Sequence, residues 1–361
     1  MVILVMFVLV GALTAGFSMM SGERATDDAT LQGEASTALA ESALQQALRN
    51  RASIGLSATP GAAAESVRVT FTGGYADVIQ QQLRPQLTDV QTGVYLIRVR
   101  GVRTRTGVYG AGNSVSNATM ISTFKRVSMR AQSAMTGING IQKAGSSGLI
   151  SGTDVCGATA GLPAVAVPTD PGITGTGQWM NSLVGTPKIS TIGADADAAA
   201  AAVPIDWDAI VNGGAITPDF DVPTVAFPAD AWFTANPNRW PTIIVRNGPN
   251  PSTEYTLPNF GRGLLMIFGD VRLNGNTAGW NGLILVGGRL RSNGSNEISG
   301  GVVSGLNVKL GFAVDDNDVN ELNGTKKFLY NSCNISSAIN GGGGASMRGY
   351  QNTWSNTFST Y

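Results

Sequence analysis

The chain contains no histidine. Histidine is the side chain that most often acts as a general base near neutral pH, and it is a common zinc ligand. Its absence excludes every catalytic group in which histidine activates a serine or cysteine. We therefore expect no catalytic residue, no enzyme activity and no cofactor.

Charged side chains are scarce. They make up 13% of the residues, against about 25% in ordinary soluble domains. The 24 basic residues balance the 24 acidic ones, so no overall field attracts nucleic acid and we expect no such partner. Frequent glycine, asparagine, serine and threonine give a polar, nearly uncharged surface, which suits a secreted β-rich protein.

Cysteine occurs only twice, at Cys156 and Cys333. In an exported chain the two can form a disulfide that closes a long loop and stabilises the fold by about 2–4 kcal/mol. Two unrelated buried thiols are the alternative, because the sequence does not give the distance between the Cα atoms.

Residues 1–20 form an apolar run without charge, MVILVMFVLVGALTAGFSMM. As a helix rising about 1.5 Å per residue, this run matches a hydrocarbon core of about 30 Å. It lacks the basic start and the shorter apolar stretch of a cleaved secretory signal. We expect the segment to be retained and to span a membrane.

The helix is predicted to continue beyond the first charges to about residue 52. Apolar residues recur there every four positions, at Leu31, Ala35, Leu39, Ala43 and Ala47. A single helix of this extent is about 75 Å long. A membrane anchor joined to a separate soluble helix is the alternative.

Gly11 and Gly16 lie within the apolar run. Each glycine weakens a helix interior by about 1 kcal/mol relative to alanine. The helix can therefore unwind easily near residues 11–17. Close helix packing through these small residues is the alternative.

The apolar start followed by Ala40-Glu41-Ser42-Ala43-Leu44 resembles a mature type IV pilin, most closely the PilX-type minor pilins. The resemblance implies removal of a leader by prepilin peptidase, with Met1 as the processed N-terminus; an unprocessed start is the alternative. It also implies ATP-driven pilus assembly machinery as a partner. From the same resemblance we predict that the helix melts near residues 11–17, at Gly11 and Gly16, when subunits leave the membrane and stack. The residues expected to pack in a filament core are Met1, Val2, Val5, Phe7, Leu9, Leu13 and Phe17.

Val5 departs from the family pattern, because most major pilins carry a glutamate at the fifth mature position. That carboxylate pairs with a neighbouring N-terminal amine in the family's usual account of subunit recruitment. Without it, apolar packing has to contribute more of the assembly energy.

Three segments after the helix alternate apolar and polar residues, at 66–72, 93–103 and 118–130. A period of two predicts strands, and their β-branched and aromatic content favours an antiparallel sheet with one buried face. We assign residues 1–52 to the helix and 53–134 to a pilin-like sheet packed on its amphipathic half.

Residues 135–335 are predicted to form a second unit. Loops rich in glycine, alanine, proline and aspartate come first, including the low-complexity run 194–202, and an internal repeat follows. Residues 263–275 align with 282–294, and a third copy begins at Gly301. This spacing is typical of a β-solenoid coil, so we expect a parallel β-helix, with an antiparallel sandwich as the alternative.

The predicted fold class is therefore α+β, with a mainly β second unit. Residues 336–361 read as a Gly-rich tail with a terminal strand, which either returns to its own subunit or pairs with a neighbouring one.

An acidic cluster, DDNDVNE, places Asp315, Asp316 and Asp318 together, with Glu321 beside them. Carboxylates at this spacing can ligate calcium, although the EF-hand pattern is missing. A solvated turn is the alternative. Four sequons permit glycosylation or arise by chance in an Asn-rich chain, at Asn117, Asn293, Asn323 and Asn334.

These features predict a structural subunit of an extracellular type IV pilus-like filament that polymerises with copies of itself. Before assembly it would reside in the inner or cytoplasmic membrane. The alternative is a membrane-tethered β-helix that binds or cleaves extracellular carbohydrate.

Overall fold

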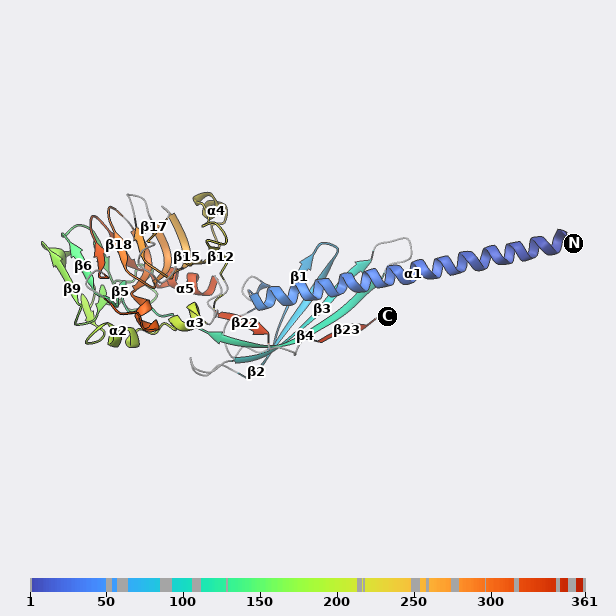
Figure 1. Ribbon diagram of the computed structural model, residues 1–361, viewed down its shortest axis with the longest axis horizontal. Coiled ribbons are helices and arrows are strands. Elements are labelled where there is room, and N and C mark those ends of the chain that lie inside the picture. The colour runs from blue at the N-terminus through green and yellow to red at the C-terminus, as the bar shows by residue number, and fades with distance from the viewer. Residues whose placement is uncertain are drawn as a thin grey trace. The chain divides into compact units, whose positions relative to one another are not determined.

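The computed structural model describes residues 2–49, 54–56, 64–84, 93–105, 112–127, 129–212, 216, 218–247, 254–257, 260–273, 279–295, 297–314, 318–341, 345–349 and 355–359. The chain forms two compact units (Figure 1). One comprises Met1–Lys125 and Met347–Tyr361, and the other comprises Arg126–Ser346.

The first unit begins with one long helix, α1 (Val2–Arg49). It is helical through Gly11 and Gly16, as predicted for the single chain. Melting near these residues concerns the polymer and stays a prediction.

An antiparallel sheet follows, with strands β1 (Glu65–Phe71), β2 (Gly74–Arg84), β3 (Gly93–Arg105) and β4 (Gly112–Arg126). The predicted antiparallel sheet is confirmed, although β2 was not foreseen. Two strands from the end of the chain, β22 (Ala345–Gly349) and β23 (Ser355–Ser359), pair with β4. The terminal strand thus returns to the sheet of its own chain.

The second half of α1 packs on one face of this sheet. Tyr95, Ile97 and Val99 of β3 are buried, as are Ala43 and Leu44 of the helix. These strand residues alternate with exposed ones, as expected for a sheet with one covered face.

Gly101 of β3 lets the two backbones approach closely. A Cβ atom added there would lie 2.2 Å from the carbonyl oxygen of Ser36 and 2.8 Å from the amide nitrogen of Ala40. Any side chain at position 101 would therefore push α1 away from the sheet.

The second unit contains two sheets in which every described strand pair is parallel. The antiparallel sandwich that we considered is therefore wrong. The larger sheet comprises β5 (Met135–Gly137), β7 (Leu149–Ser151), β8 (Val165–Val167), β10 (Leu183–Val184), β11 (Ile189–Thr191), β12 (Phe220–Val222), β13 (Thr242–Val245), β15 (Phe260–Ile267), β17 (Gly279–Val286), β19 (Glu297–Ser304) and β21 (Lys327–Tyr330). The smaller sheet comprises β6 (Ile141–Ala144), β9 (Ile173–Thr176), β14 (Tyr255–Leu257), β16 (Val271–Leu273), β18 (Leu290–Ser292) and β20 (Asn320–Leu322).

Helical segments accompany these sheets: α2 (Ala196–Ala202), α3 (Trp207–Val211), α4 (Asp230–Ala235), α5 (Ser332–Gly341), η2 (Trp179–Ser182) and η3 (Leu306–Leu310). The low-complexity run is thus not all loop, because α2 is capped by Asp195 and buries Ala199 and Ala200. Helix α5 likewise extends into residues 336–361, which were predicted to be a Gly-rich tail with a terminal strand. It buries Ile335 and Ala338.

The internal repeat pairs in register. Gly263 of β15 lies opposite Gly282 of β17, which lies opposite Gly300 of β19. The third copy thus begins one residue before the predicted Gly301. After each long strand the chain crosses to the smaller sheet, from β15 to β16 and from β17 to β18.

The larger sheet is buried on both faces. Leu265 and Ile284 belong to one apolar cluster, whereas Leu264 and Leu283 belong to a second cluster that includes residues of α2 and α3. Burial on both faces explains why the repeat has continuous runs of apolar residues, and not apolar residues that alternate with polar ones.

The stability of the second unit should depend on the paired glycines of the repeat. Gly282 has φ of +132°, and an added Cβ would lie 2.3 Å from the backbone oxygen of Gly263. We expect Gly282→Ala to destabilise the second unit by about 3 kcal/mol, through strain and overpacking. Denaturant unfolding followed by tryptophan fluorescence measures this, since Trp207 and Trp280 are buried in the unit.

Gly279→Ala in the same strand is the matched control, because its added Cβ would meet only the Glu297 oxygen at 3.7 Å. Equal effects of the two substitutions would contradict the role assigned to the paired glycines.

Two buried lysines lie in the second unit with backbone carbonyls as partners. The ammonium of Lys143 donates to the oxygens of Gly145 and Ser147 at 3.0 and 3.1 Å, and Lys326 donates to Ser292. Burial, and secondarily the charge of Lys143, lowers the pKa of Lys326 to about 7.

Replacement of Lys326 by methionine should therefore stabilise the protein at neutral pH. The unfolded lysine titrates near pH 10.4, so burying it in the folded state costs free energy that is largest at and below pH 7 and vanishes above about pH 10. The advantage of K326M over wild type should shrink by up to about 4 kcal/mol between pH 7 and 10, at about 1.4 kcal/mol for each pH unit. Denaturant unfolding across this range measures it.

Lys327→Met is the control, because this neighbouring side chain is 54% exposed and pairs with Glu297 at the surface. A pH-independent difference between K326M and wild type would show that Lys326 stays protonated in the fold.

Candidate functional site

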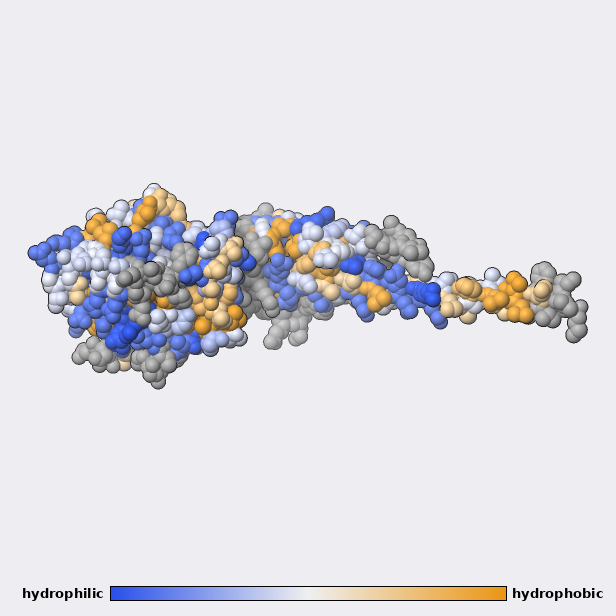
Figure 2. Space-filling model, turned by 90° about the horizontal axis from the view of Figure 1, so that it is seen from above, coloured by the Kyte–Doolittle hydropathy of each residue, from blue (hydrophilic) through white to orange (hydrophobic). Residues whose placement is uncertain are grey.

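The first half of α1 exposes large apolar side chains on all sides. Phe17 is 74% exposed and Met19 76% exposed, and the others range from 56% to 66%: Met6, Leu9, Val10, Leu13 and Met20. Figure 2 shows this apolar stretch of the helix beyond the sheet. We call residues 9–20, whose side chains are described without a gap, the apolar half of α1.

The two halves of α1 differ sharply in burial. In the second half Ala40, Ala43 and Ala47 are fully buried against the sheet of the same chain. In the apolar half an added Cβ at Gly11 or Gly16 would meet nothing within 4 Å. The described part of the chain therefore leaves the apolar half uncovered.

Covering these side chains would release considerable free energy. Full burial of one leucine, methionine or phenylalanine is worth about 1.5–3 kcal/mol. Exposed apolar patches of this kind mark sites of association.

Three of the predicted filament-core residues, Leu9, Leu13 and Phe17, thus lie on the uncovered surface. Met1 lies outside the described residues. Val2, Val5 and Phe7 lie in α1, but their side chains are not described. Within the part of the chain that the structure describes, no helix is long and apolar enough to cross a membrane.

The proposed calcium ligands are mostly outside the described residues. Asp315 and Asp316 fall there, whereas the backbone oxygen of Asp318 accepts a hydrogen bond from the side chain of Asn139. Among the described residues, no group of three or more carboxylates or cysteines is placed to hold a metal ion.

The four sequon asparagines differ in setting. Asn293 is exposed, while Asn117 in β4 and Asn323 are half-buried. The amide nitrogen of Asn334 donates to the backbone and hydroxyl oxygens of Ser299 at 3.0 and 3.2 Å. A glycan at Asn334 would break these bonds, so Asn293 is the most accessible of the four.

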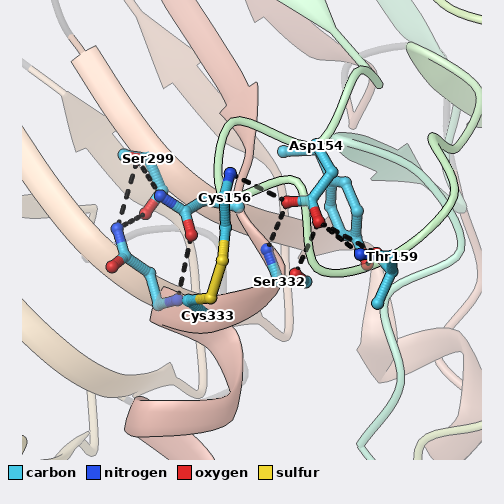
Figure 3. Close-up of a disulfide and its surroundings, with 9 residues drawn as sticks. Asp154, Cys156, Thr159, Ser299, Ser332 and Cys333 are labelled. Carbon is cyan, nitrogen blue, oxygen red and sulfur yellow. Dashed lines mark hydrogen bonds between the residues drawn. A yellow bond between two sulfur atoms is a disulfide. The ribbon is translucent and has the colours of Figure 1, made fainter.

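Cys156 and Cys333 form a disulfide, with 5.9 Å between their Cα atoms, as predicted (Figure 3). The alternative of two unrelated buried thiols is therefore wrong. The bridge joins the loop after β7 to the first turn of α5 and closes a separation of 177 residues.

A single carboxylate organises the surroundings of the disulfide. Asp154 accepts hydrogen bonds from the backbone N–H and hydroxyl of Ser332 at 2.9 and 2.7 Å, and from the same groups of Thr159 at 2.9 and 3.1 Å. It also accepts from the backbone N–H of Cys156 at 3.2 Å. Figure 3 shows these bonds beside the bridge.

Burial alone would raise the pKa of Asp154, but the hydrogen bonds from Ser332 and Thr159 outweigh it and hold the pKa well below its usual range. Sequence reasoning did not identify this residue. The only signal was an aspartate two positions before a cysteine, which also occurs in ordinary turns.

Asp154→Asn should lower the stability of the second unit by about 2 kcal/mol at neutral pH, since an amide replaces a carboxylate that accepts charge-assisted hydrogen bonds. A carboxyl whose folded pKa is depressed stabilises the fold above the unfolded pKa of about 3.9. The difference between wild type and D154N should therefore be constant above about pH 5 and shrink as the pH falls below 4. Denaturant unfolding between pH 2.5 and 7, with the disulfide intact, measures it.

Asp195→Asn is a useful control, because Asp195 caps α2 with a single bond to the N–H of Ala198. Asparagine caps helices about as well as aspartate, so D195N should stay close to wild type. A D154N effect no larger than that of D195N would contradict the organising role of Asp154.

No protein-family model matches this chain, and no curated protein matches it. Among solved structures, a crystal structure of the competence-associated pilin ComZ from Thermus thermophilus aligns with 84% of this chain and 88% of its own chain. The sequence identity is 10% and the TM-score is 0.20. A score of this size does not establish a shared fold.

Proposed function

We propose that this protein is the structural subunit of an extracellular filament whose core is built from the apolar half of α1. The proposal rests on the different burial of the two halves of α1. Its second half is buried on the sheet of its own chain, whereas its first half exposes residues such as Leu13 and Phe17. Side chains of neighbouring copies would cover them in a dry helical core.

The finer assignment is a type IV pilin-like protein of the PilX-type class. It is supported by the resemblance of residues 1–50, including Ala40-Glu41-Ser42-Ala43-Leu44, and by an antiparallel sheet that follows and packs on the helix. We interpret the second unit as a parallel β-helix, because successive strands alternate between two parallel sheets and the repeats pair in register.

The partners of this proposal are further copies of the chain, together with pilus assembly machinery and prepilin peptidase, as the family resemblance implies. Before assembly, lipid of the inner or cytoplasmic membrane would cover the apolar segment 1–20. Since residues 1–20 carry no charged side chain, apolar packing drives subunit recruitment in this account.

A charge placed in the core tests the proposal. Phe17→Glu should abolish filaments, because a carboxylate without a partner in an apolar core costs several kcal/mol. Thr26→Glu is the matched control, since it adds the same charge at an exposed helix position beyond the apolar half. Electron microscopy of cell-surface filaments, with mass spectrometry of their protein, measures both variants.

Wild-type protein found only as a membrane-bound monomer would overturn the proposal. In that case, binding or cleavage of extracellular polysaccharide by the monomer would favour the tethered carbohydrate-active alternative. Normal filaments from the Phe17→Glu chain would place the core elsewhere.

A further inference from the structure

Charge is segregated within the first unit, although the whole chain is neutral. Residues 21–49 of α1 carry five carboxylates and two arginines, whereas strands β1–β4, up to Lys125, carry seven basic residues and two acidic ones. The helix segment is therefore acidic and the sheet is basic.

Two arginines of the sheet lie on the face that α1 does not cover. Arg98 and Arg100 of β3 are exposed and alternate with the buried Ile97 and Val99, which face the helix. Asp77 lies opposite Arg100 in the register but is bound by Arg68, through hydrogen bonds of 2.7 and 3.1 Å. Among the described residues, no carboxylate pairs with Arg98 or Arg100.

Apolar side chains adjoin these arginines. Ile79, opposite Arg98 in the register, is 41% exposed, and Leu96 on the same face of β3 is half-buried. We call Ile79, Leu96, Arg98 and Arg100 the basic patch.

A complementary stripe follows one side of α1. Glu23, Asp27, Leu31 and Glu34 are separated by three or four residues, so they share one helix face. All four are exposed, and Leu31 is 63% exposed. The stripe thus combines three carboxylates with a central apolar side chain, and we call it the acidic stripe.

The arginines of the basic patch and the carboxylates of the acidic stripe are spaced at similar distances. Arg98 and Arg100 lie two residues apart on one face of a strand, a distance of about 7 Å. Glu23 and Asp27 lie four residues apart on a helix, a distance of about 6 Å. Two arginine–carboxylate pairs can therefore form at once while Leu31 packs against Ile79 or Leu96.

The two surfaces cannot meet within one chain. The stripe continues directly into the second half of α1, which packs on the opposite face of the sheet from Arg98 and Arg100. A straight helix would have to pass around the sheet edge to reach the basic patch of its own chain. Only another copy can supply the stripe.

We propose that the basic patch of one subunit binds the acidic stripe of a neighbouring copy, and that this contact sets how neighbouring subunits are placed in the filament. The inference rests on the proposed function. Copies would recognise each other through this surface, which lies outside the apolar core. Because the contact pairs opposite charges, assembly should weaken as the salt concentration rises.

Charge reversal of the full-length chain tests this contact. Arg98→Glu with Arg100→Glu should lower the amount of cell-surface filament at least tenfold in a medium of low salt. Adding Glu23→Arg with Asp27→Arg to the same chain should restore assembly, because every pair then has opposite charges again. Arg130→Glu with Lys188→Glu is the control, since it changes the net charge equally at exposed positions of the second unit.

A mixing experiment identifies the contact directly. Chains carrying Asp27→Cys are mixed with chains carrying Arg98→Cys, and oxidation should give a covalent dimer of the two. A partner chain carrying Arg130→Cys should give none. Thermal unfolding midpoints of all variants, together with the milder Arg98→Gln/Arg100→Gln chain, show that the fold is intact.

The outcomes separate the two proposals. If the wild-type chain forms no filaments, the proposed function fails, and this contact fails with it. If wild-type filaments form but the reversed arginines leave their assembly unchanged, only the contact is overturned. It is also overturned if the four-residue swap does not restore assembly, or if the arginines prove to bind a polyanion such as DNA while assembly is unaffected.

Discussion

The first unit depends on the close contact between the second half of α1 and strand β3. Gly101 brings the two backbones together, because a side chain there would collide with the helix backbone at Ser36 and Ala40. The contact buries Ala43, Leu44 and Ala47 and orients a helix that runs unbroken from Val2 to Arg49. The sheet covers only the second half of this helix. The uncovered apolar half is a consequence of this arrangement.

The second unit follows a different constraint. Its long strands are buried on both faces, so glycines in register, such as Gly263 and Gly282, provide the backbone conformation and the space that the stacked strands need. The larger sheet then needs helices to cover its outer face, and α2 and α3 supply part of that cover. A disulfide and the Asp154 carboxylate join the start of α5 to the loop after β7. The stability of this unit thus comes from local repeats, while one cross-link connects segments that are far apart in the sequence.

Much of this fold could be predicted from the sequence because its signals are local. The charge-free run predicted α1, the alternation predicted β1 and β3, and the 19-residue spacing predicted the pairing of Gly263 with Gly282. Strand β2 was missed because its buried positions include Ala76 and Gln80, which do not stand out as apolar.

Helices α2 and α5 were missed for a physical reason. Alanine and small polar residues carry little periodic signal, and packing on the sheet decides their conformation. The return of β23 to β4 depends on tertiary structure, which no local pattern encodes.

The candidate functional site also contains some residues that the sequence predicted and others that only the structure identifies. Leu9, Leu13 and Phe17 were predicted because an uninterrupted apolar run is visible in the sequence. The basic patch was not, because Arg98 and Arg100 read as ordinary outward-facing strand residues until the structure shows that Asp77 is bound by Arg68. The role of Asp154 likewise depends on bringing Ser332 and Thr159 together from distant parts of the chain.

Electron cryo-microscopy of the assembled polymer tests the central claim most directly. The account predicts that residues 9–20 of neighbouring subunits pack against one another in the interior, with helix axes about 8–10 Å apart. A polymer in which these residues face solvent or detergent, with the subunits joined only through their second units, would contradict it.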